Sequence, residues 1–176
     1  MQEYTLTGIV LDKLPFKEQD VTCVLYTEEL GRIRATAHGG RKITSKLSAH
    51  LEPLNVSQIR LVGGVLTEGG GLRFSIADAL TLYRLDAGFF PLINMVARMT
   101  PWQEPDPDLW QLLIAGGPLP SGRQLLSVLG FDPQNARCEL CGQSGVTYFI
   151  FDGFFYTCAA CPPPIASPAD YFEFTA

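Results

Sequence analysis

The sequence predicts a protein of mixed β and α modules: an N-terminal β-barrel, a small helical module and a C-terminal ribbon built around four cysteines. Residues 1–79 contain short β-prone stretches separated by turn residues. Leucine-rich segments with helix-start signals follow, and two Cys-x2-Cys pairs lie near the C-terminus. We therefore expect a barrel over 1–79, helices over 80–134, a ribbon over 135–164 and a short tail over 165–176.

Five strands are expected in the first module. The third is the clearest, because its apolar residues alternate with a polar face that carries Arg32, Arg34 and His38. Five short strands without a long helix between them are typical of a small barrel of the oligonucleotide-binding (OB) type. The expected strands cover residues 4–12, 20–27, 31–38, 54–61 and 73–77.

Three helical segments are expected next. The first repeats apolar residues at helical spacing over 82–93, with a break at Pro91. The second starts at Asp106, a predicted N-cap that is followed by Pro107 and further acidic residues. We interpret these acids as helix-start electrostatics and not as a metal site. The third starts with a capping box over Ser121–Gln124.

The cysteines carry the most specific signal in the chain. Two pairs, each with a two-residue spacing, are separated by sixteen residues that read as a hairpin with an Asp-Gly turn. Four thiolates at this spacing can bind one zinc ion and leave no open position for a catalytic water, so the predicted ion is structural. Two disulfides are one alternative, but they need an oxidising compartment and nothing in the sequence indicates export. A redox pair is the other alternative, but it would not explain a matched second pair of cysteines. The predicted ligands are Cys138, Cys141, Cys158 and Cys161; the fifth cysteine, Cys23, is expected to be a buried apolar side chain.

The composition limits the class of protein. The 176 residues are 47% hydrophobic and 18% charged, which indicates a folded globular chain. No run of about twenty apolar residues is present, and the N-terminus lacks the regions of a signal peptide. We therefore expect a cytoplasmic protein with no membrane partner.

Positive charge is concentrated in one stretch. The net charge is −5, yet the residues between Leu30 and Leu51 include five basic side chains and no acid. Such a stripe can bind phosphate on an acidic protein, although it can also be a solvated edge that prevents strand aggregation. Lys13 and Lys17 are expected beside it, in the loop between the first two strands, with Phe16 between them. The candidate nucleic-acid contacts are Arg32, Arg34, His38, Arg41, Lys42, Lys46, Lys13 and Lys17.

Catalytic signatures are missing from the sequence. The two histidines, His38 and His50, do not lie near a nucleophile motif, and no glycine-rich segment ends in the Gly-Lys-Ser/Thr of a phosphate-binding loop. We therefore expect a protein that is not an enzyme and has no small-molecule substrate.

Several motifs in order resemble the bacterial recombination mediator RecO. They are Thr7-Gly8-Ile9-Val10-Leu11, Asp20-x5-Tyr26-Thr27-x3-Gly31-Arg32, Ala37-His38-Gly39-Gly40-Arg41-Lys42-x3-Lys46-Leu47-x3-Leu51-Glu52-Pro53, Glu104-Pro105-Asp106-Pro107-Asp108-Leu109, Leu125–Gly130 and Cys138-Glu139-Leu140-Cys141-Gly142. Neither an OB barrel nor a zinc ribbon alone would produce this order over about 160 residues.

The resemblance implies a function in recombinational repair after DNA damage. Members of this family bind single- and double-stranded DNA and anneal complementary strands. They act with RecR and single-strand-binding protein to load the RecA recombinase, which implies a nucleoid-associated protein. DNA contacts of the basic barrel carry over to Arg32, Arg34, Arg41, Lys42 and Lys46. The family continues with further helices after the ribbon, whereas fifteen residues follow Cys161 here, so we expect a short form.

Three further hypotheses stand beside this interpretation. A protein–protein adaptor in a repair complex would display the same modules and bind little DNA itself. An RNA-binding factor would use the same phosphate and stacking contacts. The acidic, aromatic tail at 170–174 is hypothesised to dock within the chain on a basic or apolar surface.

Overall fold

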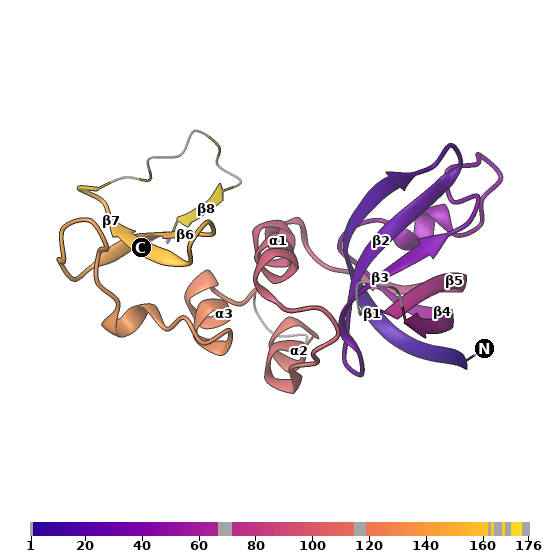
Figure 1. Ribbon diagram of the computed structural model, residues 1–176, viewed down its shortest axis with the longest axis horizontal. Helices are drawn as coiled ribbons and strands as arrows, with labels where there is room; N and C mark the ends of the chain where they lie inside the picture. Colours follow the sequence, from indigo (N-terminus) through magenta and orange to yellow (C-terminus); the bar gives the residue numbers. More distant parts are fainter. Residues whose placement is uncertain are drawn as a thin grey trace. The chain divides into compact units, whose positions relative to one another are not determined.

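A computed structural model of the protein describes residues 2–66, 72–114, 119–161, 163, 167 and 170–173 (Figure 1). The chain divides into two compact units, Met1–Trp110 and Gln111–Ala176. The first contains a five-stranded sheet and the second a three-stranded sheet, each with short helices. The expected mixture of β and α structure with an N-terminal sheet is therefore confirmed. In the described part of the chain, no helix has the length and apolar character needed to cross a membrane.

The five strands of the first unit pair in a closed order. β1 pairs with β2 and β4, β4 pairs with β5, and β2 pairs with β3, all antiparallel. A short parallel pairing of β3 with β5 completes the barrel order β1-β2-β3-β5-β4. The strands are β1 (Gln2–Phe16), β2 (Asp20–Thr27), β3 (Gly31–Ala37), β4 (Asn55–Leu66) and β5 (Leu72–Arg84).

The apolar faces of these strands form one core inside the barrel. Leu25, Ile33 and Ile59 are fully buried, and Leu51, from the 3-10 helix η1 (Ser48–Leu51), joins them. Cys23 is also fully buried, and burial raises the pKa of its thiol to about 12. It is therefore a small apolar side chain, as predicted.

The boundary between strands and helices differs from the prediction. Residues 82–84, expected to open a helix, are the end of β5, where the ladder with β4 provides backbone partners. The 3-10 helix η2 (Ala87–Phe89) follows, and α1 (Phe90–Met99) begins at the point where a break was expected. Pro91 lies in the first turn of α1, where its missing N–H is not needed, so it starts the helix and does not interrupt it.

The next two helix starts follow the sequence signals. In α2 (Pro107–Ile114), a carboxylate oxygen of Asp106 accepts hydrogen bonds from the backbone N–H groups of Asp108 and Leu109, at 3.0 and 3.1 Å. In α3 (Gly122–Val128), Ser121 and Gln124 form the reciprocal capping box. Both predicted caps are confirmed.

The second unit is a ribbon of three strands. After α3 and the 3-10 helix η3 (Pro133–Asn135), β6 (Val146–Ile150) and β7 (Phe155–Cys158) form the expected hairpin. β8 (Tyr171–Glu173) pairs with the free edge of β6, which gives the order β7-β6-β8. The tail therefore docks within the chain, as hypothesised, although Phe174 and most of 165–176 lie outside the described residues.

Phe172 ties the tail to α3. A Cβ atom added at Gly122, in the first turn of α3, would lie 2.1 Å from the Phe172 ring. The ring therefore occupies a position over α3 that only glycine leaves open.

Candidate nucleic-acid interface and metal centre

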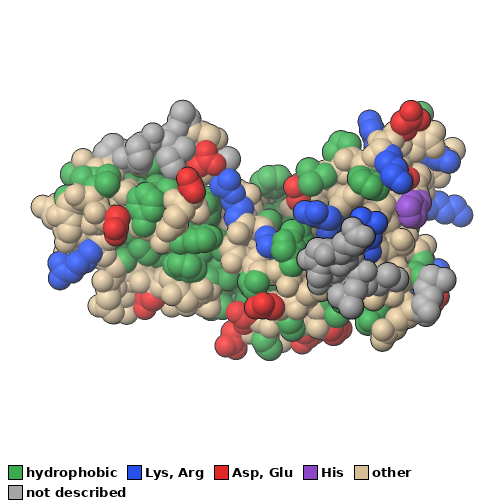
Figure 2. Space-filling view, viewed as in Figure 1, with side chains coloured by type: hydrophobic (Ala, Val, Ile, Leu, Met, Phe, Trp, Pro, Cys, Tyr) green, Lys and Arg blue, Asp and Glu red, His purple; other side chains and the backbone are tan. Residues whose placement is uncertain are grey.

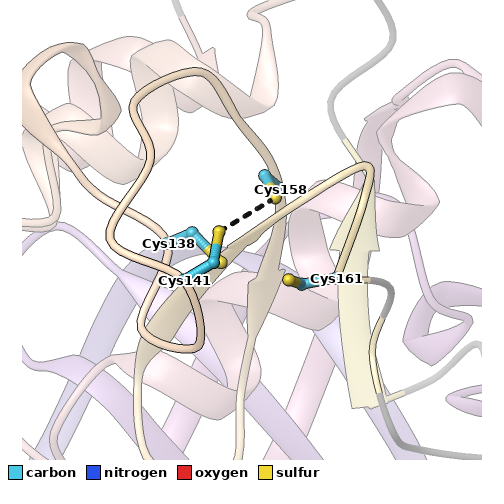
Figure 3. A group of neighbouring side chains, drawn as sticks. All are labelled: Cys138, Cys141, Cys158 and Cys161. Atoms are coloured by element: carbon cyan, nitrogen blue, oxygen red, sulfur yellow. Dashed lines mark hydrogen bonds between the residues drawn. The ribbon is translucent and has the colours of Figure 1, made fainter.

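The four predicted metal ligands lie together in the second unit (Figure 3). Their sulfur atoms are all within 4.8 Å of one another, and the Cys141 and Cys158 sulfurs are 3.6 Å apart. Four sulfurs at about 2.3 Å from a tetrahedral zinc ion would be separated by about 3.8 Å. The cluster therefore fits one such ion, and all five thiols of the chain are free.

Two tight turns place these sulfurs. In the first, the Gly142 N–H donates to the Cys138 carbonyl at 2.8 Å, and Gly142 itself has a positive φ of 73°. In the second, the Cys161 N–H donates to the Cys158 carbonyl at 3.0 Å. A hydrogen bond of 2.9 Å from the Glu139 N–H to the Tyr156 carbonyl joins the first turn to β7. The ribbon thus brings the two pairs together.

The thiols of the cluster perturb one another. Burial raises the pKa of Cys138, but backbone N–H groups of Cys158 and Cys141 outweigh it and lower this pKa to about 6. A hydrogen bond with the Cys141 thiol, followed by burial, raises the pKa of Cys161 to about 12. A divalent cation would stabilise the thiolate form of all four ligands. The donor set therefore has the chemistry of a closed structural zinc site.

The candidate DNA contacts lie in the first unit, where Lys and Arg side chains gather around the barrel (Figure 2). Arg34 is exposed on β3, and exposed His38 lies at the end of the same strand face. The loop that follows displays Arg41, Lys42 and Lys46, all exposed. An open depression of about 430 Å³ lies beside this loop, lined by Glu18, Gln19, Arg41, Lys42, Ile43 and Thr44.

The loop is fixed to the turn between β1 and β2. The Arg41 N–H donates to the Gln19 carbonyl at 2.9 Å, and the Arg41 guanidinium donates to the Glu18 carbonyl at 3.3 Å. Asp20 accepts from the Gly39 N–H at 2.8 Å and lies 3.1 Å from His38. The Gly39 hydrogen bond, followed by that of His38, holds the pKa of Asp20 below its usual value.

Two predicted contacts are engaged inside the first unit. Lys13 belongs to β1 and not to the following loop; its ammonium group is 2.6 Å from a Glu52 carboxylate oxygen and donates to Ser48. Arg32 donates to the carbonyl of Ala97 in the last turn of α1, a position that favours a cation. Phe16, also expected in the loop, ends β1, and Lys17 follows it with its ammonium group 5.3 Å from the Phe16 ring centroid.

One aromatic side chain on this surface was not predicted. Trp102 is 42% exposed, and the guanidinium carbons of Arg32 and Arg34 lie 4.0 and 4.9 Å from its ring centroid. About seventy residues separate Trp102 from β3, and its neighbours Pro101 and Gln103 gave no pattern that would pair it with a strand. In the sequence, Trp102 stood out only as an isolated aromatic residue between two expected helices.

The remaining candidates for chemistry have structural roles. The His50 Nδ1 atom accepts from the Thr81 N–H at 3.1 Å, which joins η1 to β5. Asp106 caps α2. Within the described ranges, the four cysteines are the only cluster of three or more potential metal ligands.

Comparison with known proteins matches this chain to RecO proteins, both by a family model and by individual relatives. Residues 1–74 match the family model described as Recombination protein O N terminal. A DNA repair protein RecO from Thermodesulfovibrio yellowstonii is 27% identical over 183 residues, covering 90% of this chain and 70% of the relative. The RecO protein of Geobacter metallireducens is 30% identical, covering 81% and 64%, and that of Rhodopirellula baltica is 28% identical, covering 77% and 57%.

These matches extend well beyond the N-terminal unit. The chain spans between 57% and 70% of the length of these three relatives. The chain therefore belongs to the RecO family of DNA repair proteins.

Proposed function

We propose that this protein binds single- and double-stranded DNA through the first unit, anneals complementary strands, and thereby mediates recombinational repair. In this proposal it helps to load a recombinase on single-stranded DNA that is covered by single-strand-binding protein. The relatives are named DNA repair protein RecO, which supports a role in DNA repair. The DNA-binding step rests on the charges of the barrel.

The observation that carries the proposal is a set of exposed cations without acidic partners. Ion pairs in the described part of the chain involve Lys13, His38 and Arg60. The side chains of Arg34, Arg41, Lys42 and Lys46 have no such pair among the described residues, and all four are exposed. Phosphates would neutralise them and release counterions, and a cationic surface would lower the repulsion between two strands during annealing. Contacts of this kind carry little sequence preference.

The strand order supports an OB-type assignment of the barrel. Barrels of this type bind single strands over their second and third strands and the adjoining loops. Arg34 projects from β3, and Arg41 and Lys42 lie in the loop after it. The basic stretch therefore coincides with the surface that such barrels use.

We assign a structural role to one zinc ion on Cys138, Cys141, Cys158 and Cys161. When bound, the ion would cross-link the two turns, and its four thiolate ligands would leave no open coordination position for a catalytic water. We also propose that the protein is not an enzyme, that it acts in the cytoplasm at the nucleoid, and that RecR-like and single-strand-binding-protein partners dock on it. Metal analysis of the purified protein should give one zinc per chain.

DNA binding is tested by a salt series with a fluorescent single-stranded oligomer. The variant R41A/K42A removes two exposed cations from the loop, and the matched control R60A/R73A removes two exposed cations from β4 and β5. We expect wild-type affinity to fall as salt rises, and the slope of log K against log salt to decrease by about 1.4 in R41A/K42A, or about 0.7 for each lost phosphate contact. The control should keep most of the slope.

Absence of salt-sensitive binding by the wild-type protein at low ionic strength would overturn the proposal. The adaptor function would then be favoured, with DNA held by a partner. Equal slopes for R41A/K42A and R60A/R73A would also contradict it, because binding would then depend on net charge and not on this surface.

A further inference from the structure

Trp102 lies on the outer face of the barrel although it belongs to the segment between α1 and α2. It forms an isolated parallel bridge with Arg32, and the Gln103 N–H donates to the Arg32 carbonyl at 2.8 Å. The segment thus runs beside β3 as an added edge. This places an indole ring on the same strand face as Arg34 and His38.

Several contacts hold this segment rigidly. The Asp106 N–H donates to the Tyr26 hydroxyl at 3.2 Å, and the Tyr26 ring stacks on Trp110 with centroids 6.4 Å apart. Gly31, with a φ of 62°, approaches so closely that a Cβ atom there would lie 2.2 Å from the Glu104 carbonyl oxygen. The Trp102 side chain is therefore held in place before binding, and a ligand that contacts it would not bear the entropy cost of ordering it.

The charge around the ring is unbalanced. The guanidinium groups of Arg32 and Arg34 both approach the indole, and no ion pair of either is found among the described residues. The Arg32 Nε atom is buried and has no hydrogen-bond partner in the described structure. Burial and, after it, the neighbouring Arg34 lower the pKa of Arg32. An anion beside Arg34 would relieve this like-charge contact.

A ligand for this place needs a flat apolar surface and an adjoining anion. An unpaired nucleotide has both, because its base presents a π-face and its phosphate a negative charge. Bases in a duplex are already stacked, so a duplex would offer only the phosphate. With 42% of Trp102 exposed, the ring has free area for such a contact.

We propose that Trp102 is a stacking platform for one unpaired base of single-stranded DNA, with Arg34 contacting the adjacent phosphate. This inference rests on the proposed DNA-binding function and adds an aromatic contact from outside the five strands. Along β3, Arg34 and His38 are about 13 Å apart, at roughly 3.3 Å per residue. A strand stacked on Trp102 can therefore continue toward the loop with Arg41 and Lys42.

The test compares two ligands and two variants. The ligands are an oligothymidylate and an abasic oligomer of the same length, which keeps the phosphates and lacks the bases. W102L keeps an apolar side chain, whereas W102F keeps an aromatic ring. We expect the wild type to bind oligothymidylate about 5- to 100-fold more tightly than the abasic oligomer, W102L to lose most of this preference, and W102F to retain part of it.

Intrinsic fluorescence gives a second measurement at the same site. The chain contains two tryptophans, and Trp110 is buried. Oligothymidylate should therefore quench the Trp102 emission of the wild type and leave the remaining emission of W102F unchanged. Urea unfolding of W102L and W102F, followed by Trp110 fluorescence, verifies that both variants fold.

The outcomes separate this inference from the function on which it rests. Salt-sensitive binding of both ligands with equal affinity, unchanged in folded W102L, would overturn the stacking platform and leave DNA binding intact. Absence of binding to either ligand at low salt would overturn both. Preference for oligothymidylate that is lost in W102L would support both.

Discussion

Replacing Gly31 by alanine tests the close approach that positions the segment carrying Trp102. Two effects add at this position. A residue other than glycine with a φ near 62° costs about 1–3 kcal/mol. The new Cβ atom would also lie 2.2 Å from the Glu104 carbonyl oxygen, so the segment has to move.

Gly39 provides the matched control. Its φ is 64°, yet a Cβ atom there meets only side-chain carbons of Lys42, the nearest at 3.4 Å. G39A should therefore lose only the backbone preference. G31A should also weaken the hydrogen bonds from Gln103 to Arg32 and from Asp106 to Tyr26, at about 0.5–1.5 kcal/mol each. We expect G31A to be less stable than G39A by about 1–3 kcal/mol.

Urea unfolding followed by tryptophan fluorescence measures this difference, because both tryptophans lie in the first unit. G31A should also change the accessibility of Trp102 to acrylamide, whereas G39A should leave it unchanged. Free energies of unfolding for the two variants within about 0.5 kcal/mol of each other, a difference typical of neutral surface changes, would refute the reasoning.

Three other predictions concern separate parts of the fold. R32A should lower the free energy of unfolding by about 1–3 kcal/mol, because the partly buried hydrogen bond to the Ala97 carbonyl is lost, whereas R34A should cost less than about 1 kcal/mol in the same urea experiment. Equal losses would contradict the assignment of Arg32 as structural. G122A should destabilise the second unit in the wild type through the Phe172 ring, and should be neutral or stabilising in an F172A background, since alanine favours helices; thermal unfolding in a double-mutant cycle without coupling would exclude this contact. The pKa of Asp20 is lower in the folded state than its ordinary value of 3.8, so the stability that its carboxylate contributes is present above that pH and is lost as the pH falls through the folded value. The stability difference between wild type and D20N should therefore shrink on acidification, and a difference that grows would contradict the sign.

Local signals in the sequence were sufficient for much of the fold. The caps at Asp106 and Ser121 are short-range hydrogen bonds, so a few neighbouring residues specify them. The four-cysteine cluster was identifiable because the spacing of its residues reflects the two turns that hold them. The alternation in β3 likewise marked the face that carries Arg34.

Long-range contacts account for what the sequence did not reveal. The end of β5 has helical spacing, but its partner strand β4 determines its conformation. Arg32 and Arg34 look equivalent in the sequence, and only the packing of the segments around Ala97 and Trp102 separates a structural arginine from an exposed one. Lys13 is similarly distinguished from Lys17 by Glu52, which lies far along the chain.

The most direct test of the account is annealing of two complementary fluorescent oligonucleotides. The wild-type protein should accelerate annealing at low salt, R41A/K42A should lose most of this acceleration, and R60A/R73A should retain it, because only the first pair lies in the stretch without acids. An annealing rate unchanged by the wild-type protein, or equal loss in both variants, would contradict a DNA-annealing function of this basic surface.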